Sequence, residues 1–212
     1  GAYKMHDRFV GELAFGTDTS QQVSFSALVG MRQEELSDWT LRSSVGLTYK
    51  PADQFSLDLD LNYFERKGWL LHNTERLMSK YDAGDFQPRL GMDIFFTAKQ
   101  QLRLTVQWAA IKAEVTDFLV IPEQGGTLVS LEDSNGYIPI DSVRADFALS
   151  RLTSQIRYRW EIGPLSDLFL VYTRGSNLPN RVEESYGELW EDAISYPIVD
   201  TYVAKLRYRF GN

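Results

Sequence analysis

The chain has 212 residues, a net charge of −7, no cysteine and 13% aromatic residues. The lack of cysteine excludes disulfides and thiolate chemistry within it, and the negative charge argues against a general nucleic-acid binder, which normally needs a basic surface. No run of 18 or more apolar residues occurs, so no transmembrane helix is predicted.

Apolar and polar residues alternate along most of the chain. The pattern is clearest in FSLDLDLNYF, residues 55–64, where up to Tyr63 the apolar residues share one parity and Ser, Asp and Asn the other. A period of two is typical of a β-strand with one apolar face. In chain order it predicts nine strands, over residues 3–15, 23–31, 39–49, 55–63, 90–96, 102–108, 152–162, 168–172 and 202–210. Nearly all are longer than the five or six residues usual in soluble proteins.

The predicted connections are of two kinds that alternate. Short turns are expected at GTDTSQ, KPADQ, TAKQQ and IGPLSD, with long outer loops at about 66–87, 113–147 and 176–199. Short turns at one end and long loops at the other are typical of bacterial outer-membrane barrels. Within these loops, residues 69–81 fit either a tenth strand or a short helix, and RVEESYGELWEDAISY fits a short amphipathic helix over the barrel mouth or against a partner.

Alternation alone cannot tell whether the apolar face points into a soluble barrel or sandwich, or outward into lipid. Strand length, the sorting of loops and aromatic residues near the strand ends favour lipid. We therefore expect an all-β fold, an antiparallel transmembrane β-barrel in the outer membrane of a Gram-negative bacterium. The expected aromatic girdle comprises Trp39, Tyr49, Tyr63, Trp108, Tyr158, Trp160, Tyr208 and Phe210.

The odd number of strands indicates that the chain is one part of a larger barrel, because bacterial single-chain barrels have an even number. We expect one domain over residues 1–212, with further strands supplied upstream or by other membrane subunits. The expected partners are outer-membrane lipid and the barrel-assembly machinery, and no nucleic acid.

The polar face is expected to line the lumen. Its candidate residues are Arg42, Asp58, Asp60, Asn62, Arg89, Asp93, Arg103, Gln107, Arg151, Arg157, Arg159, Lys205, Arg207 and Arg209. Basic residues gather on the late strands and acidic ones on the earlier strands, which would create a transverse field for polar or anionic solutes. The alternative is that these charges pair across the lumen and rigidify the wall.

Two histidines, His6 and His72, are the only ones in the chain. Both are expected toward the extracellular end, where a hydrolytic site on the barrel rim is conceivable. No Ser/His/Asp set converges by spacing, and no metal-ligand spacing occurs. The sequence therefore predicts no catalytic residue, no metal site and no cofactor.

The segment SQIRYRWEIGPLSDLFLVYTRGSN, residues 154–177, and the closing AKLRYRF resemble one family. Its members are large outer-membrane proteins of unknown function with an N-terminal domain similar to family-nine carbohydrate-binding modules and a C-terminal β-barrel. The resemblance implies a barrel and no catalytic residues. The predicted function is a porin-like pore or surface anchor for a polar solute, with carbohydrate as one candidate. The alternatives are a structural subunit of an outer-membrane assembly and a rim hydrolase.

Overall fold

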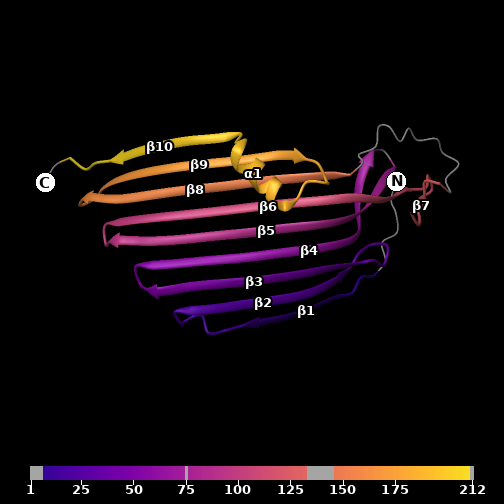
Figure 1. Cartoon of the computed structure of the whole chain (residues 1–212), viewed down its shortest axis with the longest axis horizontal. Helices are drawn as coiled ribbons and strands as arrows, with labels where there is room; N and C mark the ends of the chain where they lie inside the picture. Colours follow the sequence, from indigo (N-terminus) through magenta and orange to yellow (C-terminus); the bar gives the residue numbers. More distant parts are fainter. Residues whose placement is uncertain (1–6, 75, 133–145, 211–212) are drawn as a thin grey trace.

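The computed structural model describes residues 7–74, 76–132 and 146–210. These form one open antiparallel sheet with a single helix packed on it (Figure 1). The strands are β1 (Val10–Gly16), β2 (Val23–Gln33), β3 (Trp39–Ala52), β4 (Phe55–Thr74), β5 (Leu77–Thr97), β6 (Gln100–Val120), β7 (Val129–Ser130), β8 (Phe147–Gly163), β9 (Ser166–Asn180) and β10 (Val199–Arg207). The all-β expectation is confirmed.

The strands are arranged as a meander. Their order in the sheet is β1-β2-β3-β4-β5-β6-β8-β9-β10, and the two-residue β7 pairs with β6. Nine principal strands match the nine predicted. β1 and β10 each have one neighbour, so the described sheet has two free edges.

All three expected outer loops begin or end differently from the prediction. Residues 66–87 continue β4 and β5 as a long hairpin, and Leu77 pairs with Thr74 where a loop was expected. β6 likewise extends to Val120 and β9 to Asn180. Neither a separate tenth strand nor a helix occupies the described part of 69–81.

The apolar–polar alternation of β4 fades after Arg66 because the strand bulges at Lys67 and Gly68. The pairing of β4 with β5 shifts between Arg66 and Trp69, and Gly68 adopts a positive φ of 68° there. A bulge of this kind reverses the parity of the residues that follow. A Cβ on Gly68 would also lie 2.3 Å from Oδ2 of Asp38, so the position needs glycine.

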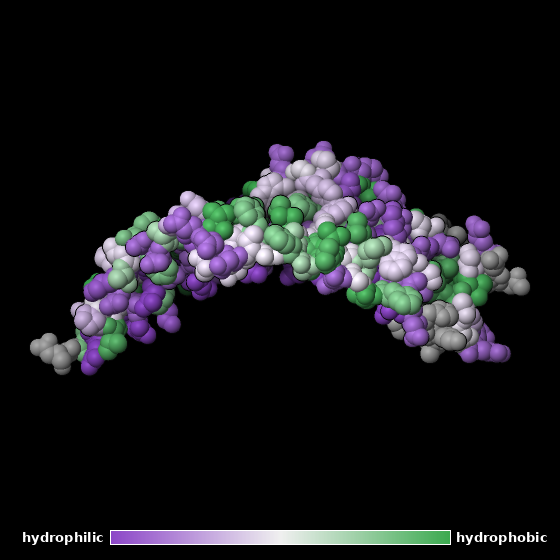
Figure 2. All heavy atoms as spheres, turned by 90° about the horizontal axis from the view of Figure 1, so that it is seen from below, coloured by the Kyte–Doolittle hydropathy of each residue, from purple (hydrophilic) through white to green (hydrophobic). Residues whose placement is uncertain are grey.

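Four short turns lie at one end of the sheet, the left in Figure 1, and we call it the turn end. The opposite end is called the loop end. Seen from the side in Figure 2, the sheet is arched rather than flat.

The buried core lies only at the loop end. We call residues 69–86, 108–121 and 147–152 with the helix the loop-end region, and residues 10–33, 39–64, 90–106, 154–173 and 199–207 the turn-end region. All buried apolar residues described are in the loop-end region. Most of them form three clusters, around Trp108, Met78 and Tyr81. In the turn-end region the buried side chains described are polar, namely Ser24, Thr40, Ser166 and Asp167.

The predicted amphipathic helix is confirmed as α1 (Tyr186–Ser195). Its Leu189 and Ala193 are buried against Trp108 and Leu152, on the face of the sheet that carries the alternating apolar residues. In Figure 1 it crosses in front of the later strands. Among the described residues, no helix is long and apolar enough to cross a membrane.

Candidate functional site

The polar face carries a row of side chains across four strands. The strand register places Asp60 of β4 beside Arg89 of β5, Arg89 beside Gln107 of β6, and Gln107 beside Thr153 of β8. Neighbouring strands are about 4.8 Å apart, so residues paired in this way have adjacent side chains on one face. The predicted candidates from separate strands thus come together.

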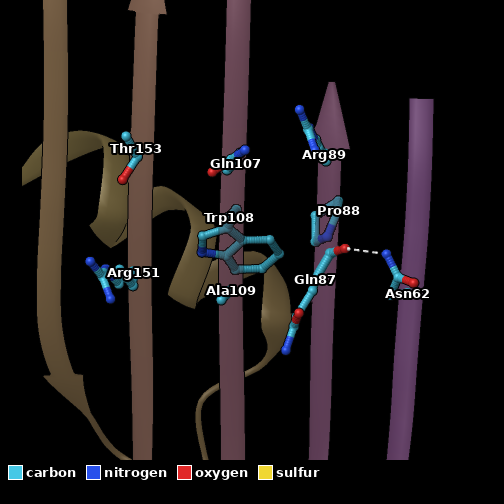
Figure 3. Close-up of a pocket in the computed structure, with 9 residues that line it drawn as sticks. All are labelled: Asn62, Gln87, Pro88, Arg89, Gln107, Trp108, Ala109, Arg151 and Thr153. Atoms are coloured by element: carbon cyan, nitrogen blue, oxygen red, sulfur yellow. Dashed lines mark hydrogen bonds between the residues drawn. The ribbon is translucent and has the colours of Figure 1, made fainter. Parts of the chain in front are cut away.

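A cavity of about 450 Å³ lies along this row. Its lining is drawn in Figure 3 and comprises Asn62, Gln87, Pro88, Arg89, Gln107, Trp108, Ala109, Arg151 and Thr153. The amide of Asn62 donates a 3.5 Å hydrogen bond to the carbonyl oxygen of Gln87. Ala109 lies opposite Arg151 in the register, and its small side chain leaves space beside the arginine.

Arg89 and Arg151 carry the charge of this cavity. Among the described residues, neither has an ion-pair partner within 4.0 Å. Both side chains are exposed to the cavity. The two guanidinium groups, the three side-chain amides of the lining and the Thr153 hydroxyl can donate several hydrogen bonds to a polar or anionic solute.

A second cavity, of about 380 Å³, adjoins the first through Arg89. It is lined by Asp58, Asp60, Arg89, Gly91, Met92, Asp93, Arg103, Leu104 and Thr105. Nε of Arg103 lies 2.8 Å from Oδ1 of Asp93, and this pair is part of the wall. The hydroxyl of Thr48 donates to Asp58 at 2.7 Å. Acidic and basic groups therefore lie side by side in this second cavity.

Other predicted lumen residues are ion-paired at the turn end. Asp167, which is almost fully buried, accepts from Nη2 of Arg159 at 3.0 Å and also contacts Arg207. This cluster joins β8, β9 and β10. Arg159 and Arg207 therefore fit the part of the structural alternative in which paired charges rigidify the wall, although they pair between neighbouring strands.

Four predicted lumen residues remain, namely Arg42, Arg157, Lys205 and Arg209. Nη1 of Arg42 lies 3.6 Å from Glu12, and its guanidinium lies over Phe64. Arg157 donates to Gln155 at 2.8 Å. Lys205 and Arg209 belong to the last segment of the chain, beside the free edge, where the backbone N–H of Arg209 donates to Ser166.

The expected aromatic girdle is exposed at most positions. Trp39, Tyr49, Tyr63, Trp160, Tyr208 and Phe210 have 39–87% of their surface exposed, and Tyr158 is half-buried. Trp108 is the exception. It is only 6% exposed, because α1 covers it and Trp190 packs on it at 5.2 Å between ring centroids. Its inclusion in an exposed girdle was wrong.

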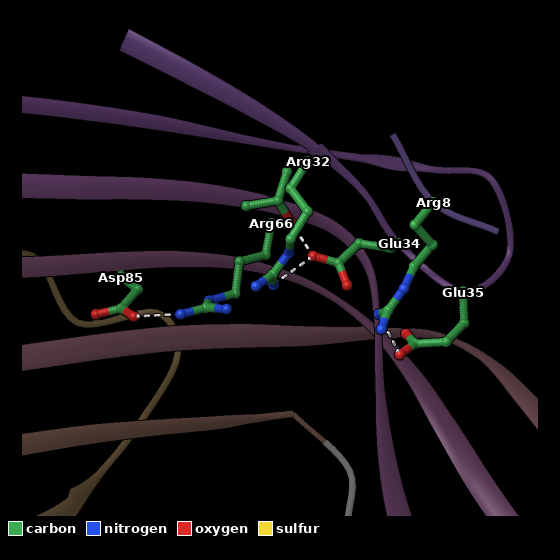
Figure 4. A network of polar contacts seen from close by, with 7 residues as sticks. Arg8, Arg32, Glu34, Glu35, Arg66 and Asp85 are labelled. Carbon is green, nitrogen blue, oxygen red and sulfur yellow. Dashed lines mark hydrogen bonds and ion pairs between the residues drawn. The ribbon is translucent and has the colours of Figure 1, made fainter. Parts of the chain in front are cut away.

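Sequence reasoning missed a polar network at the loop end, shown in Figure 4. Arg66 pairs with Asp85 at 2.9 Å, Arg32 with Glu34 at 2.9 Å, and Arg8 with Glu35 at 2.8 Å. Both Asp85 and Glu34 are nearly fully buried. Arg66 has the same parity as Asn62 and Phe64 and so continues the polar face of β4. Extending the strand pattern beyond residue 64 could therefore have identified Arg66.

His72 lies near the loop end of β4, and His6 lies outside the described residues. Within the described part of the chain, no group of three His, Asp or Glu residues is placed to hold a metal ion.

Residues 2–210 match a sequence family described as a domain of unknown function, DUF5916. The chain belongs to the DUF5916 family. No curated protein matches it, and no solved structure does either.

Proposed function

We propose that this DUF5916 chain forms part of the wall of an outer-membrane β-barrel that admits or binds a polar solute. The observation that carries the proposal is the turn-end region, where the apolar face of the sheet is left uncovered. Leu13, Phe25 and Val45 are 79%, 51% and 52% exposed. In water such a continuous apolar surface would be unfavourable, whereas in lipid it replaces the missing core.

The opposite face supports a passage for solutes. It carries the two adjoining cavities, with Arg89 between them and Arg151 at the far side of the first. In a closed barrel this face would line the lumen, and rings of charged and amide side chains select solutes by charge and hydrogen bonding. A carbohydrate fits the hydrogen-bonding groups of the first cavity.

The free edges require further strands in this proposal. Backbone N–H and C=O groups that are unpaired in lipid cost several kcal/mol each, and β1 and β10 are exposed along their whole length. Strands from elsewhere in the polypeptide, or from a partner chain, would pair with them. The resemblance of residues 154–177 implies a carbohydrate-binding module in the same protein, which would deliver a glycan to the barrel.

Substituted cysteines test the pore, because the 212 residues contain no cysteine of their own. Thr153→Cys lies in the cavity lining and Ile156→Cys on the apolar face of the same strand. We expect the full-length protein to conduct in planar bilayers, and a charged, water-soluble thiol reagent to reduce conductance only in Thr153→Cys. Membrane insertion without conductance or solute flux would overturn the pore and leave an anchor.

A structural subunit is the second candidate, and the two free edges favour it. If β1 and β10 pair with other chains, Leu13→Cys or Tyr202→Cys should cross-link to a partner of different mass in native membranes. Both residues lie on edge strands and are 79% and 78% exposed. An intramolecular cross-link would instead show that the same polypeptide closes the barrel.

A further inference from the structure

Helix α1 begins at a capped N-terminus and is hydrogen-bonded to the sheet. The hydroxyl oxygen of Ser185 accepts from the backbone N–H of Glu188 at 3.3 Å, and the Glu188 carboxylate accepts from the N–H of Ser185 at 2.7 Å. This reciprocal capping box stabilises the first turn. Ser150 of β8 then donates to the carbonyl oxygen of Leu189 at 2.8 Å. The helix is therefore held in one orientation.

The two edges of α1 that flank its buried stripe differ in chemistry. Trp190 and Ile194, four residues apart, share one edge. Glu188, Asp192 and Ser195 share the other. Leu189 and Ala193 lie between these edges and face the sheet.

Contacts with the sheet show which way each edge faces. Asn180 donates to Asp192 at 3.0 Å, and Asn180 is paired with Ala148 toward the loop end. Trp190 instead packs on Trp108, which is paired with Leu152, four residues nearer to the turn end. The acidic edge thus faces the loop end, and the apolar edge faces the turn-end region.

The apolar edge continues the exposed apolar surface of the turn-end region. Trp190 and Ile194 are 36% and 40% exposed, and Tyr196 and Ile198, which follow the helix, are 64% and 66% exposed. From Gln100 at the turn to Trp108 under the helix is eight residues of β6. Before tilt this is roughly 27 Å at the rise of a strand, close to the ~25 Å apolar band of outer-membrane barrels.

We propose that α1 lies at the lipid–water boundary on the outside of the barrel wall, with Trp190, Ile194 and Tyr196 in the bilayer interface and its acidic edge in water. This rests on the proposed membrane function. Interfacial helices lie in the plane of the membrane with one apolar and one charged side, and aromatic rings favour this depth. The helix then marks where the bilayer ends, and the loop-end region projects beyond it.

Spin labels at two adjacent residues test the position. Ile194→Cys and Ser195→Cys are both exposed but lie on opposite edges of α1. In the full-length protein in phospholipid vesicles, the label at 194 should collide more often with oxygen, which concentrates in lipid. The label at 195 should collide more often with an aqueous nickel complex. Equal aqueous accessibility at both positions would overturn the proposal.

A third label separates this proposal from the one on which it rests. Ile156→Cys lies on the apolar face within the turn-end region and is 41% exposed. If 156 is lipid-accessible but 194 is aqueous, the wall is in the membrane and the assignment of α1 is wrong. If 156 is aqueous too, the membrane function itself fails. Quenching of Trp190 by brominated lipid, compared with Trp190→Phe, checks the native helix without a label.

Discussion

The two ends of this sheet use the same strands in opposite ways. In the loop-end region, apolar side chains such as Tyr81 and Leu189 are buried, and polar groups are paired around them. In the turn-end region, buried side chains are polar and apolar ones are outside. The difference teaches that one continuous strand can pack into a protein core at one end and leave its apolar side uncovered at the other.

The largest expected effect is on the buried ion pair of the loop end. Arg66→Ala should lower the free energy of unfolding by about 4 kcal/mol, because it leaves the buried Asp85 carboxylate without its cation. Urea titration followed by tryptophan fluorescence in detergent would measure it. Arg157→Ala, an exposed arginine of the turn-end region, should cost under about 0.5 kcal/mol. Equal losses would contradict the comparison.

Truncation of one leucine in each region comes next. Leu189→Ala should cost about 3 kcal/mol, since it empties the centre of the cluster under α1. Leu170→Ala removes a side chain that is 43% exposed in the turn-end region, and should cost under about 1 kcal/mol in detergent. A larger loss for Leu170→Ala than for Leu189→Ala would show that the core lies elsewhere.

A buried hydroxyl gives a smaller effect. Ser150 accepts from the indole N–H of Trp108 at 2.8 Å and donates to Leu189, so Ser150→Ala leaves both groups unsatisfied. We expect a loss of about 2 kcal/mol and a shift in the emission of Trp108. Ser154→Ala is the matched control on the same face of β8, with one long contact of 3.4 Å. It should change neither quantity.

The pH dependence of α1 is the smallest effect. Hydrogen bonds from Ser185, first of all from its backbone N–H, hold the pKa of Glu188 below its ordinary value of 4.5. The stabilisation from capping is therefore complete above the unfolded-state pKa and is lost as the pH falls through the folded-state pKa. Contact between Trp108 and Trp190, monitored by fluorescence, should weaken on acidification. Glu188→Gln should remove Glu188's share of that change, and an identical acid transition in the variant would assign it to other groups.

Tyr186 does not contribute to the acid transition attributed to Glu188. Burial, with the nearby Tyr63 and Asp85, raises the pKa of its phenol to about 12. The tyrosine is therefore neutral across the range in which Glu188 titrates.

Local pattern was enough to predict most of the sheet. Residues 55–63 alternate without interruption, so their strand and its two faces follow from side-chain period alone. The pattern failed at Arg66–Gly68, where a bulge changes the parity. It also failed for Trp108, whose burial depends on α1, about 80 residues later in the chain.

The sequence predicted which residues belong to the polar site, but it did not predict how they are arranged in space. That Arg89, Gln107 and Thr153 face the same way follows from alternation within each strand. That they form one row depends on the register between strands, which the turns and bulges set. Contacts between strands decide which arginines remain unpaired. The ion pairs of Arg159 and Arg207 with Asp167 are an example.

The meander order has a consequence for how the sheet can grow. Each principal strand from β1 to β6, and from β8 to β10, pairs with the strand next to it in the chain. Apart from the connection between β9 and β10, which carries α1, the loops between such partners are short, so the entropy lost when they close is small, and local pairing favours rapid folding. The sheet can therefore lengthen one hairpin at a time, each new strand presenting a fresh edge as the template for the next.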